Sequence, residues 1–373
     1  MERTLDVAIA AGGTAGHINP ALALAEELVS RGHNVTFYGQ RHKLEGTLVP
    51  QAGYDFFEIE VSGFDRSRPW SIFGALWQMN KSRRALASHF ASTGAPSVAV
   101  GFGAYVEMPL LGWCSQNGVP YIIHEQNSVP GLANKTCAKD AVSVCLSFPG
   151  AQEAFAGRIG RDTSLVLTGN PVRRSVIASS REVGRDAFGL REDETALLVF
   201  GGSLGARHLN EAISRMKDEL LSRSNVRVIH STGKDLYDEV TQSLTLTEEQ
   251  GKRWQVLPYI DNMGEALAAC DVVLSRAGAS SIAEIAALAA PAILVPYPLA
   301  TADHQTTNAR YLVDAGAARL VPDDSLDTEE FEKVLLGMID DTQMRDTIRA
   351  ASKNLKQDQA ASALADQVEA AVR

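Results

Sequence analysis

Apolar and polar positions alternate along the chain in a pattern that predicts two successive sets of strand–helix units. In the first half, short apolar runs are each followed by a longer segment with apolar residues at helical spacing; these runs are 7–10, 34–38, 97–100, 119–123, 142–148 and 165–167. The second half repeats the plan, with runs at 196–200, 226–230, 255–257, 272–274 and 292–295. Short apolar strands that alternate with helices are typical of parallel sheets. The chain is therefore predicted to be an α/β protein with two doubly wound, Rossmann-like domains facing a cleft.

The chain length supports two domains, because 373 residues exceed a usual single core. The Asn170-Pro171 turn interrupts the pattern and marks 168–173 as the linker. The first domain is expected to span 1–167 and the second 174–356. The last helix, 357–373, is expected to pack back on the first domain.

Composition narrows the functional classes. The net charge of −10 argues against a nucleic-acid-binding protein. The cysteines form no CxxC pair and fit a reduced protein; they are Cys114, Cys137, Cys145 and Cys270. The N-terminus lacks the layout of a signal peptide, and no apolar run of about twenty residues occurs. Any membrane contact is therefore expected to be peripheral.

A glycine-rich turn, AGGTAGH at 11–17, follows the first strand. Asn19 is the expected cap of the next helix, with Pro20 at its first position, Val29 near its end and Gly32 as its stop. A glycine-rich turn before a helix suits a phosphate group, but the glycines do not form the dinucleotide pattern GxGxxG. His17 is a candidate general base, although a lone histidine in a turn is more often a capping or packing residue.

Residues 61–86 combine aromatic and basic side chains within an acidic protein. Such a segment suits an anionic bilayer surface, although an amphipathic helix with its aromatic side in the core explains it as well. Another polar cluster, His124-Glu125-Gln126-Asn127, follows a strand, where α/β proteins place their sites. A loop that hydrogen-bonds to itself would look the same.

A second glycine-rich turn, GGSLGAR at 201–207, opens the second half, with a helix expected over 206–221. GGSLG also matches the hydrolase pattern GxSxG, with Ser203 as nucleophile, but a phosphate turn explains it equally well. No DxD, HExxH or GxxxxGK[ST] motif occurs, so no metal site is expected.

The segment 271–308 is the richest in candidate chemistry. Ser281 and Glu284 have the spacing of a capping box for a helix over 282–289. A buried strand follows, and after it come His304, Gln305 and Asn308. Helix N–H groups, an acid and amides suit a sugar and an anion rather than an apolar ligand. On this segment alone, a Glu284 that only caps its own helix, with Gln305 and Asn308 as solvated loop residues, is the commoner explanation.

Taken in order, the motifs resemble the MurG family of bacterial glycosyltransferases from end to end. The matching segments are GGTAGHINP (12–20), GFGAYVEMP (101–109), HEQNSVPGLANK (124–135), GNPVR (169–173), FGGSLGAR (200–207), SRAGASSIAEI (275–285) and DHQTTNAR (303–310). Ala15 stands where the family commonly has glycine, a change that is tolerated if its φ is negative.

The resemblance implies a GT-B fold, UDP-N-acetylglucosamine as donor and lipid I, the undecaprenyl-pyrophosphoryl-N-acetylmuramoyl pentapeptide, as acceptor. It implies an inverting, metal-independent transfer without a cofactor. By position, the catalytic candidates are His17, Glu125 and His124. The implied donor-binding residues are Thr14, Ala15, Gly16, Asn127, Arg173, Ser203, Ile260, Ala279, Glu284 and Gln305, the first three also lying near the acceptor diphosphate. Gly12, Gly13 and Tyr105 would line the acceptor side.

The resemblance also implies a peripheral enzyme at the cytoplasmic face of the bacterial membrane, with a possible cell-wall synthesis complex as partner. The membrane patch would comprise Trp70, Phe73, Trp77, Arg83 and Arg84. Alternatives are a UDP-N-acetylglucosamine 2-epimerase, a UDP-sugar transferase acting on diacylglycerol, and a non-catalytic donor-binding scaffold.

Overall fold

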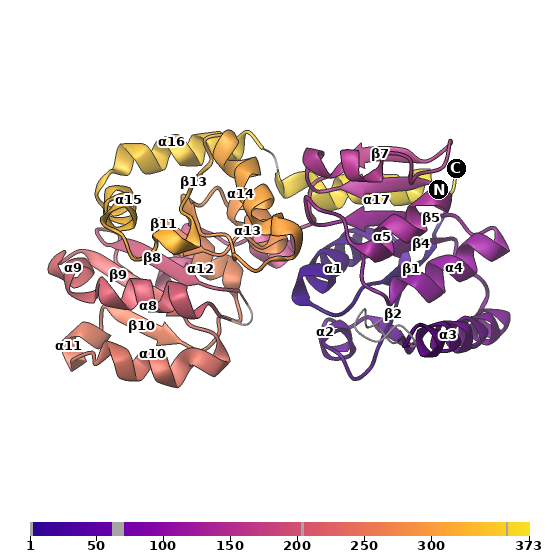
Figure 1. Ribbon diagram of the computed structural model, residues 1–373, viewed down its shortest axis with the longest axis horizontal. Helices are drawn as coiled ribbons and strands as arrows, with labels where there is room; N and C mark the ends of the chain where they lie inside the picture. Colours follow the sequence, from indigo (N-terminus) through magenta and orange to yellow (C-terminus); the bar gives the residue numbers. More distant parts are fainter. Residues whose placement is uncertain (1–2, 62–70, 203–204, 356) are drawn as a thin grey trace. The chain divides into compact units, whose positions relative to one another are not determined.

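The computed structural model describes residues 3–61, 71–202, 205–355 and 357–373, without the side chains of residues 71–73 and 75. The chain divides into two compact units (Figure 1). The N-terminal unit comprises residues 1–173 and 359–373, and the C-terminal unit comprises 174–358. Each unit contains a parallel β-sheet with helices between its strands, which confirms the predicted α/β fold class.

The N-terminal unit contains a seven-stranded parallel sheet of order β3-β2-β1-β4-β5-β6-β7. Its strands are β1 (Asp6–Ala10), β2 (Asn34–Gly39), β3 (Asp55–Glu58), β4 (Val98–Gly101), β5 (Tyr121–Glu125), β6 (Ser143–Leu146) and β7 (Ser164–Leu167). Its helices are α1 (Ala15–Ser30), α2 (Glu45–Gln51), α3 (Ser71–Thr93), α4 (Glu107–Asn117), α5 (Leu132–Cys137) and α17 (Ala360–Ala370).

Alternate strand residues divide the N-terminal core between the two faces of the sheet. Val7 and Ile9 pack with Leu24 of α1 and Leu364 of α17. Ala8 and Ala10 pack on the other face, with residues of α3 and α4. The period of two along each strand places one residue on each face. The C-terminal helix α17 therefore belongs to the N-terminal unit (Figure 1). Its Asp366 and Glu369 accept hydrogen bonds from Arg31.

The C-terminal unit contains a six-stranded parallel sheet of order β10-β9-β8-β11-β12-β13. Its strands are β8 (Thr195–Phe200), β9 (Val226–Ser231), β10 (Trp254–Leu257), β11 (Val272–Ser275), β12 (Ala292–Leu294) and β13 (Ala318–Leu320). Its helices are α6 (Arg174–Ile177), α7 (Arg181–Ala187), α8 (Arg207–Arg215), α9 (Lys217–Ser222), α10 (Tyr237–Leu244), α11 (Glu248–Gly251), α12 (Met263–Ala269), α13 (Ala279–Ala287), α14 (His304–Asp314), α15 (Glu329–Asp340) and α16 (Thr342–Lys353).

Two predicted helix starts are wrong. Helix α1 begins at Ala15 instead of Pro20, because the N–H groups of His17 and Ile18 already bond to the Thr14 carbonyl. Helix α13 begins at Ala279 with Gly278 as its cap, and no side chain caps it, so the capping box of Ser281 and Glu284 does not form.

Three further differences concern short elements. The expected helix over 206–221 is divided into α8 and α9 at Met216. Strands β3 and β13 were not predicted, because each is a short edge strand whose residues are largely half-buried or exposed.

Candidate functional site

The glycine-rich loop after β1 is fixed by a buried carboxyl group. Glu45, fully buried at the start of α2, accepts hydrogen bonds from the Gly13 N–H (3.1 Å) and the Gln40 N–H (3.2 Å). Gly13 has a φ of +84°, and a Cβ on Gly12 would come within 2.5 Å of Glu45 Oε1. Both glycines are therefore required by the way this carboxyl group ties the loop.

His17 lies in the first turn of α1 and is partly buried. Its Nδ1 is 3.1 Å from the Thr14 hydroxyl. Burial lowers the pKa of His17, and a hydrogen bond with the Gly12 backbone opposes that shift. His17 therefore remains neutral to lower pH than a solvated histidine, which leaves a ring nitrogen able to accept a proton.

The loop after β4 approaches His17 closely and is tied in the same way. A Cβ on Gly103 would lie 3.4 Å from the His17 ring. The Gly103 N–H donates to Oε2 of Glu107 (2.5 Å), a fully buried residue at the start of α4. Burial raises the pKa of Glu107 well above its ordinary value. Ala104 follows with a φ of +66°, and Tyr105 is exposed.

Glu125 ties the loop after β5. This residue is buried, and its carboxyl group accepts hydrogen bonds from the Asn127 N–H, the Gly131 N–H and the Asn134 side chain. The distances are 3.0, 3.1 and 2.8 Å. These bonds fix the backbone beside Asn127, so Glu125 positions the loop.

His124 is also fully enclosed. Its Nε2 donates to the Gly169 carbonyl (3.0 Å), and Nδ1 lies 3.0 Å from the Gln126 amide nitrogen. Burial lowers the pKa of His124 to about 4. The ring is therefore neutral and connects β5 to the 168–173 segment. Arg173, at the end of that segment, pairs through Nε with Glu26 Oε1 of α1 (2.9 Å).

In the C-terminal unit, the turn after β8 depends on close backbone packing. A Cβ on Gly201 would come within 2.4 Å of the Ala206 nitrogen. Gly205 has a φ of +75°, and its Cβ would lie 2.2 Å from the Thr232 carbonyl. Ser203 lies outside the described residues.

Gln305 connects the ends of β11 and β12. Its Oε1 accepts hydrogen bonds from the Ala277 N–H (3.2 Å) and the Tyr297 N–H (2.9 Å). The neighbouring Asn308 is buried and donates to the Ala277 carbonyl. The oxygen of Gln305 is thus engaged by the backbone, and a hydrogen bond to a sugar would come from its amide nitrogen.

Glu284 lies on α13, near the loop that contains Ile260. Burial raises the pKa of Tyr259, and the charges of Asp261 and, more weakly, Glu284 add to this shift. Ile260 and Ala279 are both buried, while Glu284 is partly exposed. The fold therefore brings together residues that the sequence separates by more than twenty positions.

Comparison with known proteins matches both units to one family. The glycosyltransferase family 28 N-terminal domain matches residues 7–146, and the family 28 C-terminal domain matches residues 196–367. A UDP-N-acetylglucosamine–N-acetylmuramyl-(pentapeptide) pyrophosphoryl-undecaprenol N-acetylglucosamine transferase of Halothermothrix orenii is 37% identical over 96% of both chains. An identically named protein of Salinibacter ruber is 36% identical, over 98% of this chain and 96% of its own.

The chain belongs to glycosyltransferase family 28. The crystal structure of MurG from Acinetobacter baumannii is 25% identical and has a TM-score of 0.73 over 98% of this chain and 99% of its own. The calicheamicin glycosyltransferase CalG4 has a TM-score of 0.68 at 16% identity, over 99% and 98% of the chains, and shares the fold. These likenesses confirm the GT-B class and the MurG resemblance.

One network in this family 28 glycosyltransferase was not predicted. Arg276 is buried at the end of β11 and donates to the carbonyls of Val295 (3.3 Å) and Pro296 (3.2 Å). It pairs with Asp323 (2.5 Å), whose other oxygen lies 2.9 Å from His208 Nδ1. The three residues come from distant segments, so no local pattern could reveal the network.

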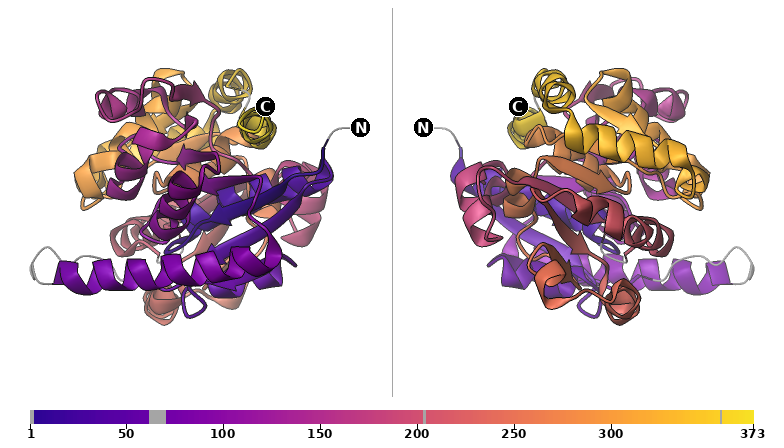
Figure 2. Two further views of the ribbon diagram at one scale, coloured as in Figure 1. Left: turned by 90° about the vertical axis from the view of Figure 1, so that its right-hand side faces the viewer. Right: turned by 90° about the vertical axis from the view of Figure 1, so that its left-hand side faces the viewer.

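The predicted membrane patch falls mainly on α3, a long helix on the outside of the N-terminal unit (Figure 2). Trp77 is 65% exposed, with the Lys81 ammonium 5.8 Å from its ring centroid, and Arg84 is exposed. Arg83 instead contacts α4, where a Cβ on Gly112 would collide with its guanidinium. Trp70 and the side chain of Phe73 lie outside the described residues.

No described helix is long and apolar enough to cross a membrane. Within the described residues there is also no cluster of three or more His, Cys, Asp or Glu side chains arranged to hold a metal ion.

Proposed function

We propose that the chain transfers N-acetylglucosamine from UDP-N-acetylglucosamine to the 4-hydroxyl of the N-acetylmuramoyl unit of lipid I, giving lipid II for peptidoglycan synthesis. The observation that carries this proposal is the 37% identity to a transferase with that name over 96% of both chains. Two family 28 domains and the solved MurG structure support it.

The C-terminal unit supplies the donor-binding residues. Glu284 accepts hydrogen bonds from the ribose hydroxyls, and the backbone of Ile260 meets the uracil. Gln305 addresses the N-acetylglucosamine through its amide nitrogen, because its oxygen already bonds to Ala277 and Tyr297. Asn127 of the N-terminal unit also addresses the sugar, and Ala279 at the start of α13 lies along the donor.

Departure of UDP requires stabilisation of the diphosphate charge. The turn after β8 precedes α8, whose N-terminal N–H groups favour an anion. Ser203 in that turn and the guanidinium of Arg173 address the diphosphate. No metal ion is required in this proposal, since helix N–H groups and a cation stabilise the developing charge.

His17 is the proposed general base. The acceptor oxygen forms a bond to the anomeric carbon while the bond from that carbon to the UDP oxygen breaks, and His17 takes the hydroxyl proton. Attack opposite the leaving group inverts the anomeric centre. Thr14 orients the ring through its hydroxyl, 3.1 Å from Nδ1. Ala15 and Gly16 form the adjoining helix start, with Gly12, Gly13 and Tyr105 on the acceptor side.

Glu125 and His124 are reassigned from catalytic candidates to positioning residues. Three donors occupy the Glu125 carboxyl group, and both nitrogens of His124 have partners in the core. Neither group is placed to exchange a proton with a substrate, since each would first have to break the bonds that hold its loop.

The enzyme is proposed to act at the cytoplasmic face of the bacterial membrane as a peripheral protein. The exposed Trp77 on α3, with Lys81 and Arg84, supports contact with an anionic lipid surface. A cell-wall synthesis complex is the proposed setting.

The test is a transfer assay with labelled UDP-N-acetylglucosamine and a soluble short-chain lipid I analogue, with and without chelator. Acceptor-dependent formation of a β-linked disaccharide that survives chelation is expected. An epimerised sugar without acceptor would establish the epimerase alternative instead. Transfer to diacylglycerol but not to the lipid I analogue would move the activity to a different acceptor, and donor binding without turnover on either acceptor would indicate a scaffold.

A further inference from the structure

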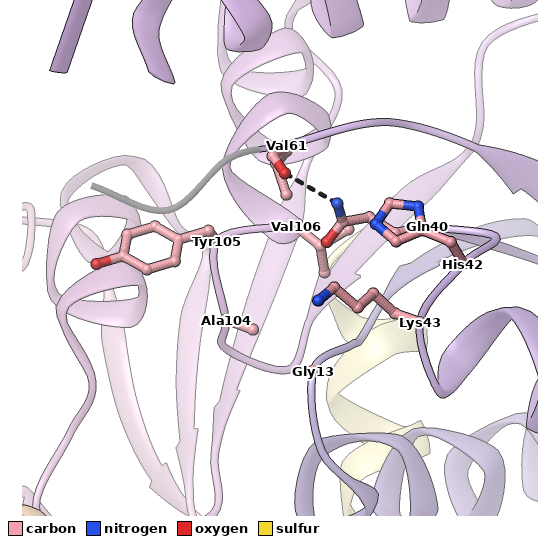
Figure 3. Close-up of a pocket in the computed structure, with 8 residues that line it drawn as sticks. All are labelled: Gly13, Gln40, His42, Lys43, Val61, Ala104, Tyr105 and Val106. Carbon is pink, nitrogen blue, oxygen red and sulfur yellow. Dashed lines mark hydrogen bonds between the residues drawn. The ribbon is translucent and has the colours of Figure 1, made fainter. Parts of the chain in front are cut away.

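A pocket of about 350 Å³ opens in the N-terminal unit beside the loops that follow β1, β2 and β4. Its lining includes Gly13, His42, Lys43, Ala104 and Tyr105 (Figure 3). Figure 3 shows the Lys43 side chain extending from the loop after β2 toward Ala104 and Gly13. Two of the described lining residues are basic by type and none is acidic, so the pocket offers positive charge to an anion.

Two glycine N–H groups in the loops beside the pocket already have acceptors within the protein. The Gly13 N–H bonds to Glu45, and the Gly103 N–H bonds to Glu107. The Glu45 carboxyl group, which is fully buried, is bonded to the lining residue Gly13, so an acidic group adjoins the pocket. These two N–H groups are therefore engaged within the protein, and Figure 3 places the ammonium of Lys43, a cation that can bind an anion, among the lining residues.

One side of the pocket is connected to the middle of α3, and the other side belongs to the loop that leads to His17. Gln40 donates to the carbonyl of Val61, another lining residue (2.8 Å). The preceding residue, Glu60, accepts hydrogen bonds from Gln78 and Ser82 of α3. On the opposite side, Gly13 belongs to the loop that leads to His17.

The chemical groups of a lipid-linked acceptor follow each other in an order that matches α3, the pocket and His17. Its polyprenyl chain is joined to a diphosphate, and the diphosphate is joined to the reacting sugar. With the lipid near α3 and the sugar hydroxyl at His17, the diphosphate falls in the pocket. Two adjacent phosphate groups also suit a cation better than a single amide or hydroxyl.

We propose that Lys43 binds the acceptor diphosphate in this pocket through its side chain, in place of the glycine N–H groups. This inference rests on the proposed function. Tyr105, which is 39% exposed, forms the wall next to Ala104. Lys43 is then a determinant of acceptor binding that has no part in donor binding.

The first test compares Lys43→Met with Lys43→Arg and with the control Lys139→Met, an exposed lysine elsewhere in the same unit. The loss of a charge-assisted contact should raise the acceptor KM about 10–100-fold in Lys43→Met. The donor dissociation constant should stay within about twofold of the parent in the same variant, since the contact is to the acceptor alone. Lys43→Arg should retain most acceptor binding, and Lys139→Met should match the parent.

A second arm identifies the anionic group. Inorganic pyrophosphate should compete with the acceptor in the parent protein and compete more weakly in Lys43→Met. The penalty of Lys43→Met should persist with an acceptor whose stem-peptide carboxylates are amidated. Disappearance of that penalty would overturn the inference, because Lys43 would then bind the peptide.

Different results would contradict the role of Lys43 and the proposed function. A parent protein that transfers sugar normally, together with a Lys43→Met variant of unchanged acceptor KM, would overturn the role of Lys43 alone. A parent protein that transfers no sugar to any lipid I analogue would overturn the proposed function. Melting temperatures of both Lys43 variants, expected to match the parent because Lys43 is exposed, exclude a folding defect as the cause.

Discussion

In the N-terminal unit, buried carboxyl groups tie the loops that follow three neighbouring strands, whereas in the C-terminal unit an arginine and an amide tie the corresponding loops. Glu45, Glu107 and Glu125 accept backbone hydrogen bonds beside β1, β4 and β5. Arg276 and Gln305 instead bind backbone groups beside β11 and β12. The two sheets share a topology class but present opposite chemistry behind their loops.

The difference shows how one architecture is adapted to two tasks. An ionised carboxyl group behind a loop disfavours an anion there unless a side-chain cation compensates. Burial raises the pKa of Glu107 and of Glu125, which favours their protonated forms and weakens this repulsion at β4 and β5. A guanidinium and an amide behind a loop impose no such repulsion, so this edge suits a nucleoside diphosphate. In the proposed function, proton transfer therefore belongs to the N-terminal unit and most of donor binding to the C-terminal unit.

The largest expected effect comes from His17→Ala. Loss of a general base should lower turnover about 10²–10⁴-fold. Because burial lowers the pKa of His17, the base is protonated only as the pH falls below its ordinary value of 6.5. The pH profile of acceptor kcat/KM in the parent should therefore have an acid limb whose midpoint lies below pH 6.5, and the variant should lack that limb. A turnover loss of less than about tenfold would remove His17 as the base.

Glu284→Ala tests the other unit. Loss of charge-assisted hydrogen bonds to the ribose should weaken donor binding by about 1–3 kcal/mol, measured by calorimetry with UDP. Helix α13 should keep its stability because no side chain caps it. The matched control is Glu330→Ala on the exposed face of α15. A dissociation constant equal in both variants would refute the ribose role.

The contributions of the buried Glu45 and Glu107 carboxyl groups to stability can be compared by Glu→Gln replacement. Glu45 accepts two backbone N–H groups through its two oxygens, so Glu45→Gln places an amide N–H against one of them and should cost about 1–3 kcal/mol of unfolding free energy. Glu107 has a strongly raised pKa and accepts one bond through Oε2, so Glu107→Gln at pH 6 should cost less than about 1 kcal/mol. Denaturant titration measures both, and equal costs would contradict this distinction.

The smallest effect concerns His208. Asp323, followed by Asp327, raises its pKa against the opposing effect of burial. A raised pKa gives stability that is complete below pH 6.5 and is lost as the pH rises through the folded-state value. Because the His208 side chain is partly exposed to solvent, His208→Gln should lower stability at pH 6 by only about 0.2–1 kcal/mol and should have less effect at pH 9. Thermal melts at the two pH values measure the change, and an equal loss at both would contradict the pairing.

Hydrophobic periodicity predicted the fold class and most strands because each buried strand forms a compact apolar run. It missed β3 and β13, whose edge positions require fewer apolar residues. The helix starts at Ala15 and Ala279 were missed because their first turns are closed by backbone bonds and not by a capping side chain. Ala15 is the first residue of α1, and its φ is not positive. The backbone at this position therefore accepts alanine in place of the family's usual glycine.

The candidate site was predicted mainly through the family motifs, and the physical roles of its members were not. Nothing in a linear pattern distinguishes the buried Glu45 and Glu107 from solvated acids at helix starts. Similarly, His124 and Glu125 resemble catalytic groups until their enclosed hydrogen bonds are known. Burial and the hydrogen bonds of the folded loops, which a linear pattern does not reveal, decide these roles.

The most direct test of this division between the units is the donor-binding isotherm of His17→Ala, recorded beside the parent and Glu284→Ala with UDP-N-acetylglucosamine. We expect His17→Ala to bind the donor as tightly as the parent while its turnover falls about 10²–10⁴-fold. Only Glu284→Ala should lose donor affinity. Loss of donor binding in His17→Ala would place His17 in the donor site and contradict the assignment of proton transfer and donor binding to different units.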